Sequence, residues 1–426
     1  MSPSTATPLR STRPTPERLR IDNGLTVIAE AHPAADVAAV QLWVRVGARD
    51  EVGPEAGFSH FIEHLLFKGT PTRGPGVIDE TVSGLGGEMN AATSHDFTYY
   101  HVVLPARHLG TALAVVADAA MHAVLDPAEL ERERLVVLEE IRRAEDSPGA
   151  YLWRLLTRHH FPDHPYGRPV LGMPESIGSA RRDDLAAYYR RHYAPNNATV
   201  VVAGRIDHGH ATDQVREAFA GWTPRPIPDG GSRRAGDLSA VRRVEEPRPL
   251  QQAYLGVAWA GPTVPDPDVY AVEVLAGILG RGRASRLNQS LKEERGLVSS
   301  VGASFYPLRD SGIVSVTART SGDRRHAVEG ALLDEIERLR TDLVSDAELA
   351  RALTAVEAGY AFSRETAEGV AYAYGLAETV WTLDFELGYL DQVRQVTREQ
   401  IRDAARRYLV ADRFTAAVLA PETTAP

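Results

Sequence analysis

Apolar and polar side chains alternate over two short stretches near the N-terminus, and this alternation predicts β-strands. Between residues 40 and 46, apolar side chains are separated by Gln41, Trp43 and Arg45, a period of two that indicates a half-buried strand. Residues 21–28 carry an Asn–Gly pair between apolar side chains, which predicts a hairpin turn.

Apolar positions then recur with the longer period of helices, interrupted by one stretch rich in Thr, Tyr and Val. That stretch, 86–104, predicts a pair of strands. Helices are expected over residues 57–67, 108–125, 126–146 and 182–193. The helix at 126–146 has clear start signals, because Asp126 is a favoured N-cap and Pro127 suits the first helical position.

A Pro- and Gly-rich stretch at 222–250 separates these elements from a second series of the same kind. That series comprises a strand at 252–259, a helix from Asp266, strands within 299–318, helices at 326–343 and from Asp346, and a closing helix and strand. The two series end alike: RDDLAAYYRRHYAPNNATVVVAG (182–204) resembles REQIRDAARRYLVADRFTAAVLA (398–420), with Thr199 and Thr415 lying 216 positions apart. A repeat of this length indicates internal duplication.

These patterns predict an α+β fold of two homologous domains that arose by internal duplication. Each domain is expected to be a mostly antiparallel sheet with helices packed on one face. The expected parts are a disordered lead at 1–17, a first domain at 18–221, a linker at 222–250 and a second domain at 251–426. Of the 14 histidines only His326 follows the linker, so we expect metal chemistry in the first domain.

Composition removes several classes of function. The chain has 426 residues and no cysteine, so a metal must be held by His, Asp or Glu. A net charge of -10 argues against nucleic-acid binding, and short apolar runs interrupted by charge predict no membrane span. The N-terminal residues lack the apolar core of a signal peptide, so a cytoplasmic location is expected. Only Lys68 and Lys292 are lysines, which we attribute to genome composition.

The segment His60-Phe61-Ile62-Glu63-His64 is the strongest candidate for chemistry. On a helix, His60 and His64 lie one turn apart on the same face, so both imidazoles can reach one metal ion. Glu63 can then reach a water at that metal and act as a general base without being a ligand. The order H-x-x-E-H is the signature of inverzincin peptidases. The structural alternative is two histidines on a half-buried helix beside a solvated glutamate.

A catalytic zinc usually needs a third protein ligand, and the helix at 126–146 is rich in glutamate. Its apolar stripe consists of Leu130, Val137, Leu138 and Ile141. Glu133 and Glu140 are seven residues apart and flank this stripe, whereas Glu139 points nearly opposite. Either Glu140 or Glu133 could therefore face an internal metal. The alternative is an ordinary charged helix face.

Together these segments resemble the insulinase/pitrilysin family of zinc metallopeptidases, of the processing-peptidase type. The matching segments are GFSHFIEHLLFKGT (57–70), GLGGEMNAATSHDFTYY (84–100), ERERLVVLEEIRRAEDSP (131–148), HPYGRPVLGMPESI (164–177), YYRRHYAPNNATVVVAG (188–204) and LAGILGRGRASRLNQSLKEERGLVSSV (275–301). The resemblance covers nearly the whole chain from about residue 18.

The resemblance implies one zinc ion per chain and a role for each matching residue. The implied zinc ligands are His60, His64 and Glu140. Glu63 would be the general base, and Glu133 would support the site without binding metal. Asn90 and Ala91 would lie on an edge strand to which a peptide substrate adds as a further strand; the alternative for Asn90 is a turn residue.

One segment departs from the family pattern. Active members carry an Arg and a Tyr that contact the substrate and the developing oxyanion, and here Lys292 and Ser299 stand at those positions. Lysine lacks the bidentate fork of arginine, and serine is too short to replace tyrosine. In two-subunit members a metal-less homologue supplies the Arg/Tyr pair. We therefore expect this chain to be the zinc subunit of a heterodimer, with a homodimer of altered activity as the alternative.

The predicted function is a zinc-dependent endopeptidase that cuts extended peptides, such as leaders or presequences, inside a chamber closed by two chains. The alternative is a non-catalytic structural or assembly subunit of the same family. The complete set of His60, His64, Glu63 and Glu140 favours the peptidase, because such subunits tend to lose ligands.

Three weaker features complete the sequence. A glycine-rich loop contains Gly277, Gly280 and Gly282, but no Gly-Lys-Ser/Thr follows, so it more readily lets a helix approach the sheet or substrate. His159, His160 and His164 are expected in a solvated loop. His95 and Asp96 are expected to be surface residues at a strand end.

Overall fold

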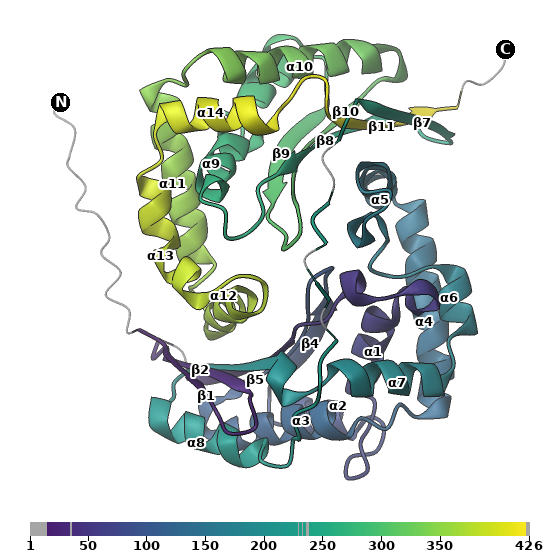
Figure 1. Ribbon diagram of the computed structural model, residues 1–426, viewed down its shortest axis with the longest axis vertical. Coiled ribbons are helices and arrows are strands. Elements are labelled where there is room, and N and C mark those ends of the chain that lie inside the picture. Colours follow the sequence, from purple (N-terminus) through teal and green to yellow (C-terminus); the bar gives the residue numbers. More distant parts are fainter. Residues whose placement is uncertain (1–14, 35, 229, 232, 236–237, 423–426) are drawn as a thin grey trace.

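The computed structural model describes residues 15–34, 36–228, 230–231, 233–235 and 238–422. The chain forms two units of mixed sheet and helix, one above the other in Figure 1. Most of the expected N-terminal lead lies outside the described residues. Its last residue, Glu17, begins strand β1 (Glu17–Arg20).

The first sheet has the strand order β1-β2-β6-β3-β5-β4. Its other strands are β2 (Thr26–Ala31), β3 (Val37–Val44), β4 (Glu88–Thr93), β5 (Thr98–Pro105) and β6 (Ala198–Gly204). Only β2 and β6 pair in parallel. The predicted hairpin turn joins β1 to β2, and Gly24 adopts a φ of +88° there, a conformation that glycine adopts without steric cost.

The second sheet has five described strands in the order β7-β11-β8-β10-β9, which repeats the order β2-β6-β3-β5-β4 of the first sheet. Its strands are β7 (Arg242–Arg248), β8 (Ala253–Gly261), β9 (Ser300–Tyr306), β10 (Gly312–Thr320) and β11 (Thr415–Pro421). Again one pair is parallel, β7 with β11. Thr26 is opposite Thr199 in the first sheet and Arg242 is opposite Thr415 in the second. Both residues of that pair are displaced by the same 216 positions, which agrees with a duplicated unit.

Strand β7 lies inside the stretch 222–250 that was expected to be a linker. The second sheet therefore begins at Arg242. The strand was hidden in the sequence because RRVEEPR contains few β-forming residues. It pairs only with β11, at the margin of its sheet, where a proline is tolerated.

Helices pack against both sheets; the helices that the sequence predicts are all present, but six of those that the structure describes were not predicted. Those of the first half are α1 (Phe58–Leu66), α2 (Val77–Gly84), α3 (Leu109–His122), α4 (Pro127–Asp146), α5 (Pro148–His160), α6 (Pro174–Ser179), α7 (Arg182–His192) and α8 (His208–Ala218). Those of the second half are α9 (Asp268–Gly280), α10 (Arg325–Thr341), α11 (Asp346–Phe362), α12 (Ala367–Val380), α13 (Leu383–Arg394) and α14 (Arg398–Tyr408). The Asp126 carboxylate caps α4 by accepting from the backbone N–H groups of Ala128 and Glu129, as predicted.

Helix α12 of the second domain covers the face of the first sheet that its own helices leave open (Figure 1). Strand β3 was predicted to be half-buried, and this prediction is wrong, because both Gln41 and Trp43 are fully buried beneath α12. The Gln41 side chain donates to the backbone oxygen of Glu368 at 3.0 Å. Gly375 lies so close to Trp43 that a Cβ atom there would be 1.9 Å from its indole nitrogen.

Helix α5 of the first domain makes the reciprocal contact, because it packs against β8 and β11 of the second sheet. The predicted solvated loop of histidines is therefore wrong: His159 and His160 end α5. His160 is buried and its ring nitrogen lies 3.1 Å from the Thr415 hydroxyl. His164 lies beside the buried Asp310 carboxylate.

Buried charges join the domains where the β4–β5 turn meets the second sheet. The expectation that His95 and Asp96 are surface residues is wrong for Asp96, which is buried and accepts a 2.8 Å hydrogen bond from the Tyr166 hydroxyl. Arg49, also buried, pairs with Asp310 at 2.8 Å. A His95 ring nitrogen lies 3.2 Å from the Arg168 backbone oxygen. Of these contacts, the Arg49–Asp310 pair crosses from the first domain to the second.

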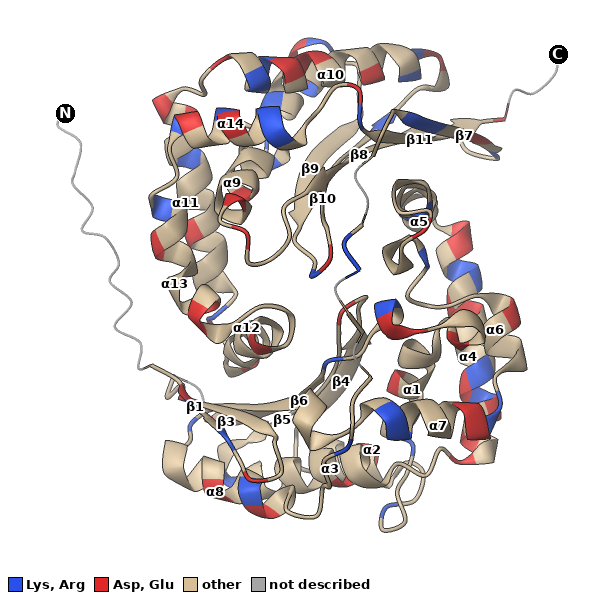
Figure 2. Cartoon of the chain, in the orientation of Figure 1, with Lys and Arg blue, Asp and Glu red and all other residues tan. Residues whose placement is uncertain are grey.

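Gly277 and Gly280 were expected in a loop but lie in the last turn of α9; the expected close approach to the sheet is confirmed. A Cβ atom on Gly280 would lie 2.0 Å from the backbone nitrogen of Ala303, so glycine lets α9 approach β9 closely. Acidic and basic residues are interspersed along the outer helices in Figure 2, whereas most strands carry neither. Within the described part of the chain, no single helix has the length and apolar character to cross a membrane; α3 and α4 meet that test only as a pair bent by 97°.

Candidate metal centre

Helix α1 presents the H-x-x-E-H segment, and its first turn is held from the side by a buried carboxylate. Both oxygens of Glu51 accept backbone hydrogen bonds, from Gly57 at 2.8 Å and from Ser59 at 2.9 Å. These N–H groups have no partner within the helix. Gly57 has a φ of +90° and touches Gly172 closely. The start of α1 is therefore fixed next to His60, the first candidate metal ligand.

Helix α4 packs beside α1 and brings Glu140 to both histidines. One Glu140 oxygen lies 3.5 Å from Nε2 of His60 and 3.6 Å from Nε2 of His64. The three candidate ligand atoms all lie within 4.8 Å of one another. Tetrahedral zinc, with bonds of about 2.0–2.2 Å, places its ligand atoms about 3.3–3.6 Å apart. The His–His–Glu group therefore fits a zinc ion, and such a set leaves a fourth position open.

Glu133 is placed differently from Glu140, although the helical pattern had left the two undecided. One Glu133 oxygen lies 2.9 Å from Nδ1 of His64, and the other lies 2.8 Å from the Lys68 ammonium. Burial opposes the charge on Glu133, but the hydrogen bonds from Lys68 and His64 outweigh it and lower its pKa. Glu133 thus faces the far nitrogen of His64, and Nε2 is left for a metal.

The protonation of the two imidazoles follows from their surroundings. Burial, and then the neighbouring His64, lower the pKa of His60, so His60 stays neutral and able to bind metal. Burial also opposes a charge on His64, but the hydrogen bonds to Glu140 and Glu133 outweigh burial and raise the pKa of His64. Without a metal, the two carboxylates favour a proton on His64, which a metal ion would displace.

Glu63 lies on the side of α1 that faces strand β4. The Thr93 hydroxyl, at the end of β4, donates to one Glu63 oxygen at 2.6 Å. Burial raises the pKa of Glu63, and the Thr93 hydrogen bond opposes this effect. Glu63 is not part of the three-residue group. Glu63 is thus a half-buried carboxylate: Thr93 fixes one of its oxygens, and the other oxygen is available to accept a proton.

Strand β4 is at the margin of the first sheet and pairs there only with β5. Asn90 is opposite His101 and Ala91 is opposite Tyr100. The Asn90 side chain is exposed and accepts from the Ala91 backbone N–H at 2.9 Å. Both residues predicted to bind substrate therefore lie on an edge strand next to α1, where a further strand can pair.

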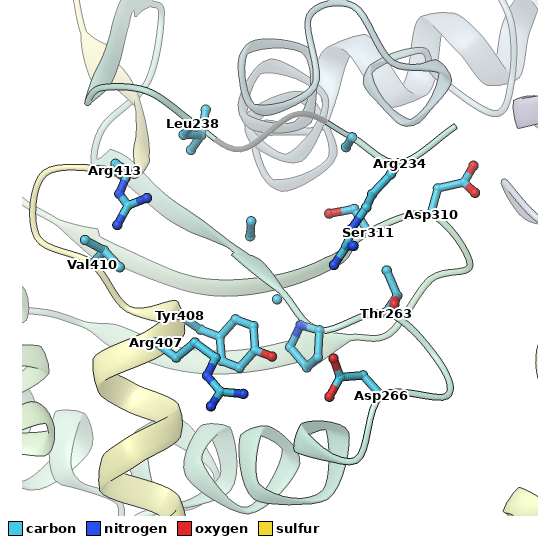
Figure 3. Close-up of a pocket in the computed structure, with 14 residues that line it drawn as sticks. Arg234, Leu238, Thr263, Asp266, Asp310, Ser311, Arg407, Tyr408, Val410 and Arg413 are labelled. Atoms are coloured by element: carbon cyan, nitrogen blue, oxygen red, sulfur yellow. The ribbon is translucent and has the colours of Figure 1, made fainter. Parts of the chain in front are cut away.

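Lys292 and Ser299 lie in the second domain, away from the elements that build the metal centre. Lys292 is an exposed residue of a π-helical segment, Asn288–Glu294. The Ser299 hydroxyl lies 3.4 Å from the Gln252 side-chain oxygen. The second domain also has a pocket of about 210 Å³, and none of the predicted site residues lines it (Figure 3). Its Arg407 and Tyr408 side chains are already paired with Asp268.

Sequence reasoning missed three residues that support the centre: Glu51, Lys68 and Thr93. Lys68 lies two residues after α1 and is one of two lysines in the chain, so its presence is a signal that genome composition alone does not explain. Thr93 belongs to the strand that contains Asn90. Glu51 lies nine residues before His60, and no local pattern marks it as a buried cap.

Two family models match the chain. Residues 26–174 match the model described as insulinase (peptidase family M16), and residues 179–356 match the model described as peptidase M16 inactive domain. The first match contains every predicted site residue from His60 to Glu140. The boundary between the matches falls before α7 and β6, which belong to the first domain of the structure.

Curated relatives and solved structures resemble the chain over nearly its whole length. A zinc protease of Mycobacterium tuberculosis (strain ATCC 25618 / H37Rv) is 34% identical over 411 residues, 95% of this chain and 93% of the relative. One of Streptomyces coelicolor is 32% identical, covering 93% and 87%. The crystal structure of a protease from Helicobacter pylori has a TM-score of 0.92 at 24% identity, covering 96% and 100%. A peptidase M16 inactive domain from Pseudomonas fluorescens has a TM-score of 0.88 at 19% identity, covering 96% and 99%; at these identities both likenesses concern the fold.

Proposed function

The chain belongs to the insulinase family of peptidases, family M16, and from this premise we propose that it is a zinc-dependent endopeptidase acting on extended peptides. The observation that carries the proposal is the group of His60, His64 and Glu140, whose spacing suits tetrahedral zinc. A carboxylate suited to proton transfer, Glu63, lies on the same helix.

His60, His64 and Glu140 would hold the zinc ion, which would polarise the scissile carbonyl and lower the pKa of water toward about 7. The proton transfers are proposed to be carried out by residues of the chain. Glu63 takes a proton from the attacking water on its available oxygen, while Thr93 keeps the other oxygen in place. As the C–N bond breaks, Glu63 returns that proton to the leaving amine nitrogen. Water is thereby added across one peptide bond.

The substrate is proposed to bind as an added strand along β4. Main-chain hydrogen bonds to this edge would hold any extended peptide, and Asn90 and Ala91 lie where they would form. The Asn90 side chain, which now accepts from the Ala91 N–H, would have to yield that group to the peptide. Such recognition suits leader or presequence segments, which are unfolded. Absence of cysteine suits a reducing compartment, and we place the activity in the cytoplasm.

We propose that the active form is a heterodimer enclosing a chamber, in which this chain supplies zinc and a metal-less homologue supplies an Arg/Tyr pair. Support comes from Lys292 and Ser299, which replace that pair in this chain. A missing oxyanion donor costs about 2.7–4 kcal/mol of barrier. Cleavage by the chain alone and in a mixture with such a homologue tests the proposal. Full activity alone would instead favour a homodimer.

The competing function is a non-catalytic structural or assembly subunit. The complete ligand group and the nearby Glu63 favour the peptidase, because a structural role needs neither. Glu63→Gln separates the two in a cleavage assay of the zinc-loaded protein. We expect a loss of about 10²–10⁴-fold in kcat/KM with zinc retained. Glu139, a half-exposed residue paired with Arg142 on α4, supplies the control Glu139→Gln, which should cleave normally. Unchanged cleavage by Glu63→Gln would refute the role of Glu63.

A further inference from the structure

Lys68 lies just beyond α1, outside the H-x-x-E-H segment, yet it contacts the metal centre through one carboxylate. Its ammonium is 2.8 Å from Oε1 of Glu133, and Oε2 of the same group is 2.9 Å from Nδ1 of His64. The other nitrogen of His64 faces Glu140. A continuous line of polar contacts therefore runs from Lys68 to the predicted zinc position.

The loop after α1 holds Lys68 in place. Its backbone N–H donates to Leu65 at 3.1 Å and ends the helix. Two residues later, the Thr70 hydroxyl donates to the Asp118 carboxylate at 2.6 Å, and Thr72 does the same at 2.8 Å. Because Asp118 belongs to α3, the loop is anchored to the core of the domain. The ammonium thus has a fixed origin although its side chain is about one-third exposed.

The choice of lysine at this position runs against the composition of the chain. Of 47 basic residues only two are lysines, so arginine is the default cation of this protein. The two side chains differ in how they bind a carboxylate. An arginine fork commonly takes both oxygens, whereas an ammonium is a point charge that can bind one. At Glu133 the second oxygen is already needed by His64.

The two zinc-ligand histidines are not supported equally. Nδ1 of His60 is buried and has no hydrogen-bond partner among the residues that the structure describes. Nδ1 of His64 has Glu133. The hydrogen bond on one ring nitrogen decides which nitrogen is left for a metal. Of the two histidines, His64 is therefore the one whose metal-facing nitrogen is selected by a carboxylate.

We infer that Lys68 is a positioning residue for zinc binding: it holds one oxygen of Glu133 and leaves the other on His64, a division that arginine would abolish. The inference rests on the proposed zinc-dependent function. This role can be distinguished from that of an ordinary surface ion pair. A simple Lys68–Glu133 ion pair would tolerate Lys68→Arg. An arginine that took both Glu133 oxygens would instead deprive His64 of its partner.

Zinc affinity, measured by competition with a chromophoric chelator, tests this difference. We expect Lys68→Met to bind zinc about 10–100-fold more weakly, the usual cost of losing an indirect partner of a ligand. Lys68→Arg should also bind at least about 5-fold more weakly. Arg132→Met is the matched control, because Arg132 is an exposed cation of α4 paired with Glu129; it should bind normally. Wild-type affinity in Lys68→Arg would overturn the inference.

A spectroscopic readout separates positioning from loss of fold. In the cobalt(II)-substituted protein, the Nδ1–H proton of His64 should give a slowly exchanging, shifted NMR signal. That signal should be lost or broadened in both Lys68 variants while circular dichroism stays unchanged. Its persistence in Lys68→Arg would contradict the inference even if Lys68→Met failed to fold. Failure of the unmodified chain to bind zinc would refute the proposed function itself, which is a different outcome.

Discussion

The two domains share the order of five strands, but the helix that packs beside the edge strand differs between them in its polar side chains. In the first domain α1 carries His60, Glu63 and His64 and lies beside β4. In the second, α9 lies beside β9 and is apolar except for Asp268 and Glu273. The first helix carries polar side chains toward its strand, and the second approaches its strand at Gly280 with an apolar face. The fold thus provides the position, and a few side chains provide the chemistry.

The domains are alike in a second respect, because each sends a helix across to the other's sheet. Helix α12 covers β3 and β6, and α5 covers β8 and β11. The helix α5 follows directly after α4, which carries Glu140. The domain that carries the candidate zinc ligands is therefore covered in part by a helix of the other domain.

The largest expected effect comes from making the first domain resemble the second. Glu140→Gln should reduce zinc affinity by at least about 100-fold, because even an indirect partner of a ligand contributes 10–100-fold. Chelator competition measures this loss. Glu273→Gln, on the corresponding helix α9, is the control and should keep wild-type affinity. Equal losses in the two variants would remove the asymmetry between the domains.

A smaller effect should follow from disturbing one helix exchange and not the other. A Cβ atom at Gly375 would lie 1.9 Å from Nε1 of the buried Trp43, whereas at Gly256 it would lie 3.1 Å from a flexible Leu156 methyl. We expect Gly375→Ala to lower the free energy of unfolding by about 3 kcal/mol. Gly256→Ala should lower it by less than about 1 kcal/mol. Denaturant unfolding measures the free energy of unfolding of both variants. Equal values would show that Trp43 has room to move.

The contact of α5 with the second sheet should weaken in acid. Burial, and then the nearby Arg242, lower the pKa of His160 to about 4, so the folded protein resists a proton that the unfolded chain accepts near pH 6.5. The stabilisation by neutral His160 is complete above about pH 6.5 and is lost as the pH falls toward 4. At pH 5 the loss should be about 2 kcal/mol.

His160→Gln isolates this contribution, because glutamine can still bond Thr415 but does not titrate. Between pH 7 and pH 5, the unfolding free energy of the variant should fall less than that of the unmodified chain. Identical pH profiles would mean that α5 releases His160 to solvent before the protein unfolds.

The sequence predicted elements that are determined by a few neighbouring residues, such as a helix cap or a tight turn. Asp126 and Pro127 marked the start of α4, and the Asn–Gly pair marked the first hairpin. The sequence did not reveal α5 and α12, because their apolar faces are buried against strands of the other domain. The polar pattern around Gln41 was misleading for the same reason: its cover is 327 residues away.

The candidate site divides along the same line. His60, Glu63 and His64 form a short pattern on one helix, and helical geometry narrowed the third ligand to Glu133 or Glu140. Distances to the histidine nitrogens then distinguish the two glutamates. Lys68 and Thr93 were missed, since their partners, Glu133 and Glu63, become neighbours only after α4 and β4 pack against α1.

We propose that the first domain alone holds one zinc ion through His60, His64 and Glu140. Calorimetric titration of the metal-stripped full chain with zinc is the decisive measurement. We expect one tight site per chain, which disappears in the double variant His60→Ala/His64→Ala while the fold is retained. No tight site, a second tight site, or binding that survives in the double variant would contradict it.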